Sequence, residues 1–333
     1  MYTIGIFSLE LDLHAYAIMD NLRKVHGVKC HFVGTNATVK NGGLIWRSGK
    51  EYLGKLKSYE GEWFNVSDLD LIWWRRVNQP QVETDLIQDE VSKEIVTNEW
   101  KSSILGIVLD KFKGVWINKP HTDLYGGNKL LHLNAADSVG LRIPNTLISQ
   151  DYNSILDFCQ EMGGEVIVKK LLGTSLKPLV TLKLRYEDLK KSKNSIELCP
   201  AIYQEIVGGN NHLRVNCFGE NVHSILIEAN RLDWRRDLSV PFKKHKLDRN
   251  TEAKLIKLLN ILDLRMGIMD LKYNEEGEIV WLEINTQGQF LFGEALSGYD
   301  LTNAFSEFLI DMIKNNRRKN KNGTEQSIAV KLL

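Results

Sequence analysis

The sequence predicts an α+β fold built from several subdomains, and three observations support this prediction. The chain opens with the pattern strand, helix, strand. Its middle part mixes amphipathic helices with short apolar strands, separated by glycine-containing breaks. Its last third holds several strands in succession, and the final two, within Met266–Phe290, form a hairpin. A chain of 333 residues with 43% apolar content is long enough for two or three packed cores.

The overall composition argues against several partners and compartments. The 43 Lys and Arg residues nearly cancel the 42 Asp and Glu residues, so the charge indicates neither nucleic acid nor membrane as a partner. No run of 18 apolar residues occurs, and no basic residues precede the N-terminal apolar segment, so we expect neither a membrane span nor a signal peptide. Four scattered cysteines without metal-site spacing are typical of buried thiols in a reducing cytosol, which predicts a cytoplasmic protein.

The N-terminal segment is predicted to be a β-α-β unit. Tyr2–Phe7 is rich in strand-forming residues, and Leu9–Lys24 has apolar residues at helical spacing until Gly27 ends the helix. Val28–Val33 then forms a second strand. The first turn lacks the G-x-G-x-x-G pattern, which disfavours dinucleotide binding there. Leu44–Arg47 is a further candidate strand.

Two arginines follow a strongly apolar strand in Asp70–Arg76. In an open α/β sheet the carboxyl end of a strand faces the ligand crevice, so Arg75 and Arg76 could meet a carboxylate or phosphate. A solvated strand end explains the two residues equally well. Downstream, Glu83–Lys113 is predicted to be helical, and a strand in Gly114–Pro120 closes the first domain.

The central segment carries two lysines that could bind an anion. Lys129 lies at the start of a predicted helix that Gly140 ends, where a positive charge opposes the helix dipole unless an anion is near. A solvated lysine is an equally good interpretation, and the P-loop pattern is not met. After a strand in Ile143–Ile148 and a helix from Asp151, Lys169 ends another strand. The loop that follows it, Leu171–Ser175, could cradle a phosphate or act as a lid, although paired lysines at a strand end are common.

The C-terminal part reads as an antiparallel meander followed by helices. Its elements are strands in Ala201–Val207, His212–Phe218 and Val222–Ala229, a helix in Asn250–Leu264, and a last helix in Asp300–Lys314. The basic tail that follows is expected to be flexible. It lacks aromatic residues for base stacking, which disfavours contact with nucleic acid.

The hairpin in Met266–Phe290 carries the side chains of a candidate metal site. Strand periodicity places Glu283 and Asn285 on one face of the second strand, and Asp270 on the first strand can pair beside them. Oxygen ligands of this kind suit Mg²⁺. The alternative is an exposed hairpin with ordinary surface carboxylates. That alternative explains the turn residues Glu275 and Glu276 better than it explains two acids flanked by apolar residues.

Several motifs resemble one enzyme family. D-L-K followed by W-L-E-I-N is similar to the metal-binding end of the ATP-grasp fold. T-Q-G-Q-F-L-F-G-E and W-W-R-R-V-N-Q-P are similar to segments of the graspetide (microviridin-type) peptide ligases, and G-L-R-I-P-N-T resembles their G-L-x-I-P-x-T. The resemblance implies an ATP-grasp fold in four parts: an N-terminal α/β (pre-ATP-grasp) domain at 1–118, a central lid subdomain at 119–200, a C-terminal antiparallel-sheet subdomain with the metal site at 201–316, and a flexible tail at 317–333.

The resemblance also implies a role for individual residues. Lys129 and Lys169 match the lysines that bind ATP phosphates, and Arg214 and Arg235 match catalytic arginines beside them. The adenine-holding hinge corresponds to Gln204, Glu205, Ile206 and Val207, and the magnesium ligands correspond to Asp270, Glu283 and Asn285. Arg75 and Arg76 are weaker substrate candidates. The chain departs from the family where His212 replaces an acid, where Lys170 replaces proline, and where E-I-N-T replaces E-I-N-P.

The activity implied by the resemblance is that of an ATP- and Mg²⁺-dependent ligase. Such an enzyme activates Asp or Glu side chains of a ribosomal precursor peptide, which has a leader and a core, as acyl phosphates. It then forms macrocyclic ester or amide cross-links with Ser, Thr or Lys side chains, and it could act as a homodimer. The alternatives are an ATP-grasp ligase that adds amino acids to a small molecule or protein C-terminus, a non-catalytic nucleotide-binding protein, and a plain interaction protein.

Overall fold

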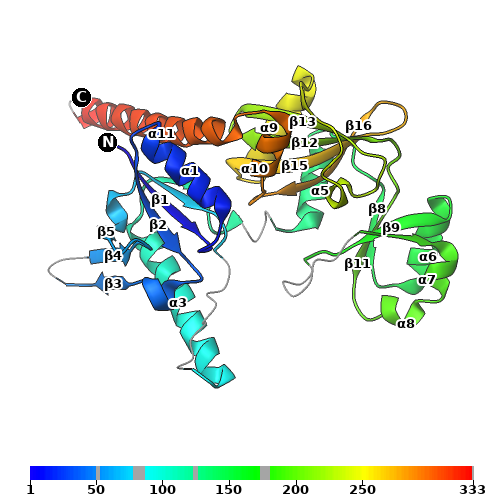
Figure 1. The fold of residues 1–333 in the computed structure, drawn as a ribbon, viewed down its shortest axis with the longest axis horizontal. Helices are drawn as coiled ribbons and strands as arrows, with labels where there is room; N and C mark the ends of the chain where they lie inside the picture. Colours follow the sequence, from blue (N-terminus) through cyan, green and yellow to red (C-terminus); the bar gives the residue numbers. More distant parts are fainter. Residues whose placement is uncertain (50–52, 78–86, 123–126, 173–180, 332–333) are drawn as a thin grey trace. The chain divides into compact units, whose positions relative to one another are not determined.

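The computed structural model of the chain describes residues 1–49, 53–77, 87–122, 127–172 and 181–331. The chain divides into two compact units (Figure 1). The first contains residues 1–120 and 300–333, and the second contains residues 121–299.

The first unit is built on a parallel sheet with the strand order β2-β1-β6-β7. Its strands are β1 (Thr3–Ser8), β2 (Lys29–Gly34), β6 (Leu71–Trp74) and β7 (Val115–Ile117). With α1 (Leu13–Lys24), β1 and β2 form the predicted β-α-β unit, and all four residues of β6 are buried. Parallel strands that are covered on both faces are expected to be continuous apolar runs, and the β6 sequence L-I-W-W is one.

Helices and a small second sheet cover the two faces of this parallel sheet. One face packs against α3 (Glu90–Lys111) and an antiparallel sheet of β3 (Leu44–Arg47), β4 (Leu53–Lys57) and β5 (Trp63–Asn65). Trp73 lies on the opposite face, where its ring contacts Phe305 of α11 (Leu301–Lys331) at 4.9 Å between centroids. The short elements α2 (Thr38–Asn41) and η1 (Val66–Asp68) complete the unit.

The last helix differs from the prediction in length and in the unit to which it belongs. It continues to Lys331 instead of ending near Lys314, so the basic segment is helical here. It also packs within the first unit, whereas the sequence analysis placed residues 300–316 with the C-terminal subdomain. The physical reason is that its apolar residues, such as Phe305, contact β6 and that Arg317 pairs with Asp70 at 2.6 Å.

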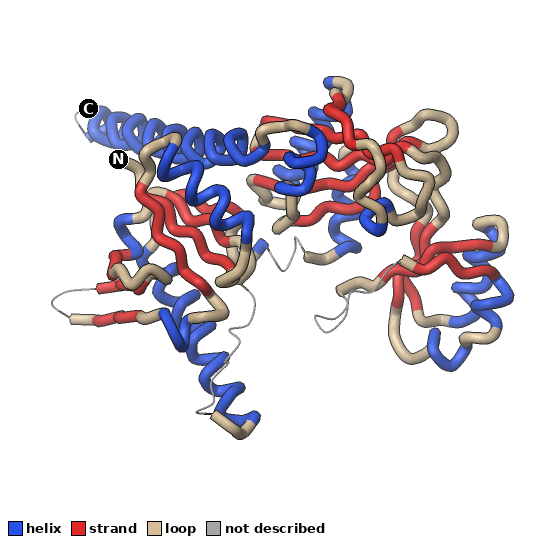
Figure 2. The backbone as a smooth tube through the Cα atoms, in the orientation of Figure 1, coloured by secondary structure: helices blue, strands red, loops and turns tan. Residues whose placement is uncertain are grey.

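The second unit contains two antiparallel sheets (Figure 2). The sheet of the central part has the order β10-β9-β11-β8, formed by β8 (Thr146–Ser149), β9 (Glu165–Lys169), β10 (Leu182–Arg185) and β11 (Ala201–Gln204). One face of it packs on α6 (Tyr152–Glu161), α7 (Tyr186–Lys190) and α8 (Lys193–Ile196) through a small apolar core. The other face carries Ile167, Lys169 and Gln204, which line a cavity.

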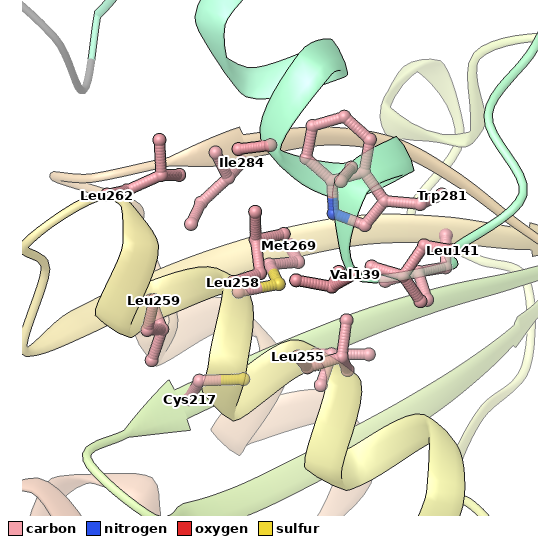
Figure 3. Close-up of a cluster of buried hydrophobic side chains, with 14 of the residues drawn as sticks. Val139, Leu141, Cys217, Leu255, Leu258, Leu259, Leu262, Met269, Trp281 and Ile284 are labelled. Carbon is pink, nitrogen blue, oxygen red and sulfur yellow. The ribbon is translucent and has the colours of Figure 1, made fainter.

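The larger sheet has the order β14-β13-β12-β15-β16. Its strands are β12 (Asn211–Phe218), β13 (Asn221–Glu228), β14 (Phe242–His245), β15 (Met266–Tyr273) and β16 (Ile279–Asn285), and the short helices η2 (Trp234–Arg236) and α10 (Leu291–Ser297) flank it. Figure 3 shows its main core, where leucines of α9 (Arg249–Ile261) meet Met269 and Trp281. α5 (Lys129–Ser138) contributes Ala135 and Ala136 to the same core.

The predicted three-strand meander is wrong in one respect. β12 and β13 pair as expected, but β11 pairs with β8 and β9 in the other sheet. Gly208 and Gly209 separate β11 from β12, and Gly209 has a φ of +85°, which turns the chain from one sheet to the other. Local sequence does not specify the partner of a strand, so this choice was not predictable.

None of the described helices is both long enough and apolar enough to span a membrane.

The cysteines supply a first testable prediction. Cys30, Cys159 and Cys217 are buried, and burial raises the pKa of Cys30 and Cys217 to about 12, whereas Cys199 is exposed. Because the thiolate is the reactive form, a maleimide reagent should label Cys199 in the native protein and the other three only after denaturation. Mass spectrometry of labelled peptides measures this. Rapid native labelling of Cys217 would contradict the core of the larger sheet.

Candidate active site

A cavity of about 500 Å³ lies in the second unit between its two sheets. This volume is in the range of small-molecule binding sites, which are mostly 300–1,000 Å³. Apolar side chains such as Ile167, Val207 and Leu282 form part of its wall. The rest of the wall carries charges of both signs. The basic residues are Lys129, Lys169, Lys170, Lys272 and Arg235, and the acidic residues are Glu205, Asp233, Asp270 and Glu283.

A β-bulge in the hairpin places its carboxylates in this cavity. Asp270 of β15 lies directly opposite Glu283 of β16, but the next residue, Leu271, lies opposite Trp281. Leu282 is therefore an extra residue in β16. As a result Trp281 and Ile284 both point into the core, while Leu282 and Glu283 both line the cavity.

Arg214 holds Asp270 in place. The two residues lie opposite each other on β12 and β15, and Nη1 of Arg214 donates to both carboxylate oxygens of Asp270 at 2.9 Å. Nη2 of Arg214 donates to the carbonyl oxygen of Gln289 at 3.1 Å. Burial and the neighbouring Glu283 carboxylate raise the pKa of Asp270, although Arg214 acts in the opposite direction. Asp270 lines the cavity and is thus fixed to the neighbouring strand β12 by Arg214, which is not itself part of the lining.

Glu283 faces the positive charges of the cavity. Burial alone would raise its pKa, but Lys129, Lys169 and the two arginines hold the pKa of this carboxyl below its usual value. The closest of them is Lys129, with 3.5 Å between Nζ and Oε2, and Lys129 also donates to the carbonyl oxygen of Lys170 at 3.2 Å. Burial lowers the pKa of Lys169, whose Nζ donates to Oε1 of Gln204 at 2.9 Å.

Arg235 enters the cavity from the loop between β13 and β14. Its guanidinium donates to both oxygens of Asp233 through Nε and Nη2, each at 2.8 Å. This two-pronged pair fixes the direction of the arginine. Trp234 between them is buried against Phe242 and Phe292, which anchors the loop to the sheet.

The predicted hinge segment lies partly on the cavity wall. Gln204, Glu205 and Val207 line the cavity, whereas Ile206 is not part of its lining. The segment is tied down from the larger sheet, because the buried Lys272 donates from Nζ to the carbonyl oxygen of Val207 at 2.8 Å. The carboxylate of Glu205 accepts hydrogen bonds from Arg142 and Asn145.

The three side chains predicted to bind Mg²⁺ carry oxygen atoms of the kind that a hard cation prefers, and Asp270 and Glu283 line the cavity, whereas Asn285 is not part of its lining. Asp270 and Glu283 lie side by side on the hairpin, and Asn285 follows two residues later on the same face. Its amide oxygen accepts one hydrogen bond, from the backbone N–H of Gln287 at 3.0 Å, and an amide oxygen has a second lone pair. Among the described residues, no group of three His, Cys, Asp or Glu side chains could hold a metal ion. A magnesium site with three protein ligands therefore requires Asn285 in addition to Asp270 and Glu283.

The two weaker substrate candidates, Arg75 and Arg76, do not line this cavity. Arg75 belongs to the first unit, where it is 1% exposed and its Nε donates to Asp12 at 2.6 Å. Arg76 follows it, and its carbonyl oxygen accepts from Thr35 at 3.3 Å. Of the predicted lid loop, residues 173–175 lie outside the described part of the chain.

The cavity residues that the sequence analysis did not propose for the site include Lys272 and Leu282 of the hairpin. The alternation of apolar and polar residues in β15 places Lys272 on the face of Asp270, and this signal could have found it. No local signal marks Leu282, because only the bulge turns it toward the cavity. His212, which lies opposite Lys272, also lines the cavity, and burial with Lys272 nearby lowers its pKa to about 4.

Comparison with known proteins identifies the fold. No protein-family model and no curated protein sequence matches the chain. Among solved structures, the macrocyclase MdnC from Microcystis aeruginosa MRC, bound with precursor peptide MdnA, is similar with a TM-score of 0.83 and 22% identity, covering 93% of this chain and 99% of that one. A Chryseobacterium gregarium RiPP-associated ATP-grasp ligase, in complex with ADP and a leader and core peptide, has a TM-score of 0.83 and 18% identity, covering 93% and 97%.

A further solved structure is similar to the chain with a lower TM-score. D-alanyl-alanine synthetase A from Vibrio cholerae has a TM-score of 0.61 and 14% identity, covering 95% of this chain and 98% of that one. The chain therefore has the ATP-grasp fold, which confirms the predicted fold class. Within that fold, its architecture is similar to those of the two peptide-bound structures over nearly their whole length.

Proposed function

We propose that this chain is an ATP-dependent ligase that cross-links side chains of a ribosomal precursor peptide. One observation carries the proposal: lysines from the central part and carboxylates from the hairpin line the same cavity of about 500 Å³. Its fold is similar to structures described as a macrocyclase with its precursor peptide and as a RiPP-associated ligase with a leader and core peptide. These similarities support a peptide as the substrate.

The proposed reaction has two balanced steps. An Asp or Glu carboxylate of the peptide attacks the γ-phosphorus of ATP, which forms an acyl phosphate and releases ADP. A Ser or Thr hydroxyl, or a Lys amine, then attacks the acyl carbon, loses its proton and displaces phosphate. The peptide loses one water for each ester or amide formed, because its oxygen leaves on the phosphate.

The protein's task in such a reaction is positioning and charge compensation. Lys129 and Lys169 would bind phosphate oxygens, and Arg235, aimed by Asp233, would compensate charge that develops during transfer. Arg214 would act mainly by holding Asp270. Asp270, Glu283 and Asn285 would hold Mg²⁺, which neutralises phosphate charge when bound. Gln204 to Val207 would accommodate the base against Ile167 and Leu282.

A second candidate function uses the same cavity. D-alanyl-alanine synthetase shares the fold, so ligation of free amino acids is the alternative. It is less well supported, because the TM-score is 0.61 against 0.83 for the peptide-bound structures.

Mass spectrometry distinguishes the two functions. The purified chain is incubated with Mg²⁺, ATP and a peptide, encoded near its gene, that has a leader and a core rich in Asp or Glu and in Ser, Thr or Lys. We expect peptide masses lower by whole waters, with one ADP released for each water lost. In a parallel incubation that offers free amino acids in place of the peptide, ADP release with a condensed amino-acid product would support the alternative. The absence of ADP formation in both incubations would refute both functions.

A further inference from the structure

A chain of hydrogen bonds crosses the central sheet of the second unit and ends at Lys169. Gln204 of β11 lies between β8 and β9, opposite Thr146 on one side and Ile167 on the other. Its amide Nε2 donates to Oγ1 of Thr146 at 2.9 Å, and its Oε1 accepts from Nζ of Lys169 at 2.9 Å. Gln204 is only 2% exposed, so its amide is largely shielded from bulk water.

The hydroxyl of Thr146 determines which groups donate and which accept in this series of hydrogen bonds. A hydroxyl has a single proton, and that of Thr146 is donated to the carbonyl oxygen of Pro144 at 2.7 Å. Thr146 can therefore only accept from Gln204, which requires the NH₂ group of the amide to face Thr146. The amide oxygen then has to face Lys169. Thr146 thus determines which end of Gln204 meets the lysine.

We propose that Thr146 and Gln204 are positioning residues that act on bound nucleotide through Lys169. This inference rests on the proposed function. Thr146 itself is not part of the cavity lining, and its described side-chain contact that leads to a charged group of the cavity runs through Gln204 to Lys169. A neutral amide directs one N–H of the ammonium and leaves its positive charge and its other two N–H groups for an anion.

The group that accepts the hydrogen bond of Lys169 is the neutral amide of Gln204, and its neutrality affects how strongly Lys169 attracts phosphate. A carboxylate in place of the amide would form an ion pair with the ammonium and would weaken its attraction for phosphate. Lys129 is also held by a neutral acceptor of the central part, the carbonyl oxygen of Lys170. Both lysines therefore donate to neutral acceptors in or next to the sheet that bears β9, whereas the carboxylate nearest to Lys129, that of Glu283, belongs to the larger sheet.

The test measures the affinity for Mg²⁺·ADP by calorimetry in four single variants. Thr146→Val removes the hydroxyl at nearly constant shape and should weaken binding by about three- to tenfold, the loss expected when a hydrogen bond to a charged group is misdirected. Thr146→Ser keeps the hydroxyl and should bind as the wild type does. Gln204→Glu keeps the shape but adds a charge, and it should weaken binding by about tenfold or more. The control is Tyr203→Phe, because Tyr203 faces the opposite core and its loss of a hydroxyl should leave affinity unchanged.

A double-mutant cycle separates positioning from a general loss of structure. In a Lys169→Met background, Thr146→Val should no longer change affinity, because the residue through which it acts is gone. A structural role would weaken binding equally in both backgrounds. Wild-type affinity in Thr146→Val, or equal losses in Thr146→Val and Thr146→Ser, would overturn this inference alone. Failure of the wild-type chain to bind Mg²⁺·ADP would overturn the proposed function as well.

Discussion

Replacing Glu283 with glutamine is expected to reduce ATP-dependent dehydration of the precursor peptide by at least about a hundredfold. The carboxylate lies opposite Asp270 and 3.5 Å from Lys129, and it is the partner of the positive charges that line the cavity. The amide keeps the shape of the side chain but supplies neither the negative charge nor the two equivalent oxygens that a magnesium ligand needs. The side chain is 32% exposed, so the substitution should leave the fold intact.

The matched control for this variant is Glu276→Gln. Glu276 lies in the exposed turn of the same hairpin, and its substitution makes the same chemical change about seven residues from the site. Water losses measured by mass spectrometry, together with thermal unfolding of each variant, give the answer. Near wild-type dehydration by the Glu283→Gln protein would show that this carboxylate is not part of the reaction site. Asp270 is less informative, because its loss also leaves the buried Arg214 without its partner.

Replacing Lys169 with methionine is expected to weaken binding of Mg²⁺·ADP by about 10- to 100-fold, the value of one or two hydrogen bonds from a charged group. Methionine fills nearly the same space and carries no charge. Because burial already lowers the pKa of Lys169, the ammonium is costly to the folded protein without an anion. The unfolding temperature without nucleotide should therefore stay the same or rise, while the stabilisation by nucleotide falls.

Lys183→Met provides the comparison for this variant. Lys183 lies on the neighbouring strand β10 and pairs on the surface with Glu165 at 2.7 Å. Its replacement should change neither nucleotide affinity nor, by more than about 1 kcal/mol, stability. Calorimetric titration and thermal unfolding with and without nucleotide measure both effects. Equal affinities of the Lys169→Met and wild-type proteins would mean that the lysine does not contact the phosphates.

The sequence predicted those elements whose patterns are local. The β-α-β opening and the 266–285 hairpin agree with the structure to within a few residues, because apolar periodicity and glycine turns depend on neighbours in the chain. The same period placed Glu283 and Asn285 on one face and Asp270 beside them, as the register shows. The strands β4, β5, β10 and β14 were not predicted, since each has no more than five residues, and β5, β10 and β14 are also edge strands of their sheets.

The cavity illustrates the limit of such reasoning. Simple alternation would place Trp281 on the same face as Glu283. Because the β-bulge adds Leu282 between them, the Trp281 side chain lies in the core instead. The resemblance assigned Gln204 to the adenine site through its backbone, and it did not predict that the side chain accepts a hydrogen bond from Lys169. Arg75, proposed from its position at a strand end, is buried against Asp12. In each case a contact with a distant residue decided the outcome.

By itself, then, the sequence determined the kinds of element, the α+β class and the chemical groups available: lysines at a helix start and a strand end, and acids on a hairpin. Only the tertiary structure decided which of these groups meet. β11 pairs with β8 and β9, and not with β12, so Gln204 lies between Thr146 and Lys169. Periodicity follows from the geometry of a few consecutive residues, but strand partners and bulges depend on packing across tens of residues, which no local pattern encodes.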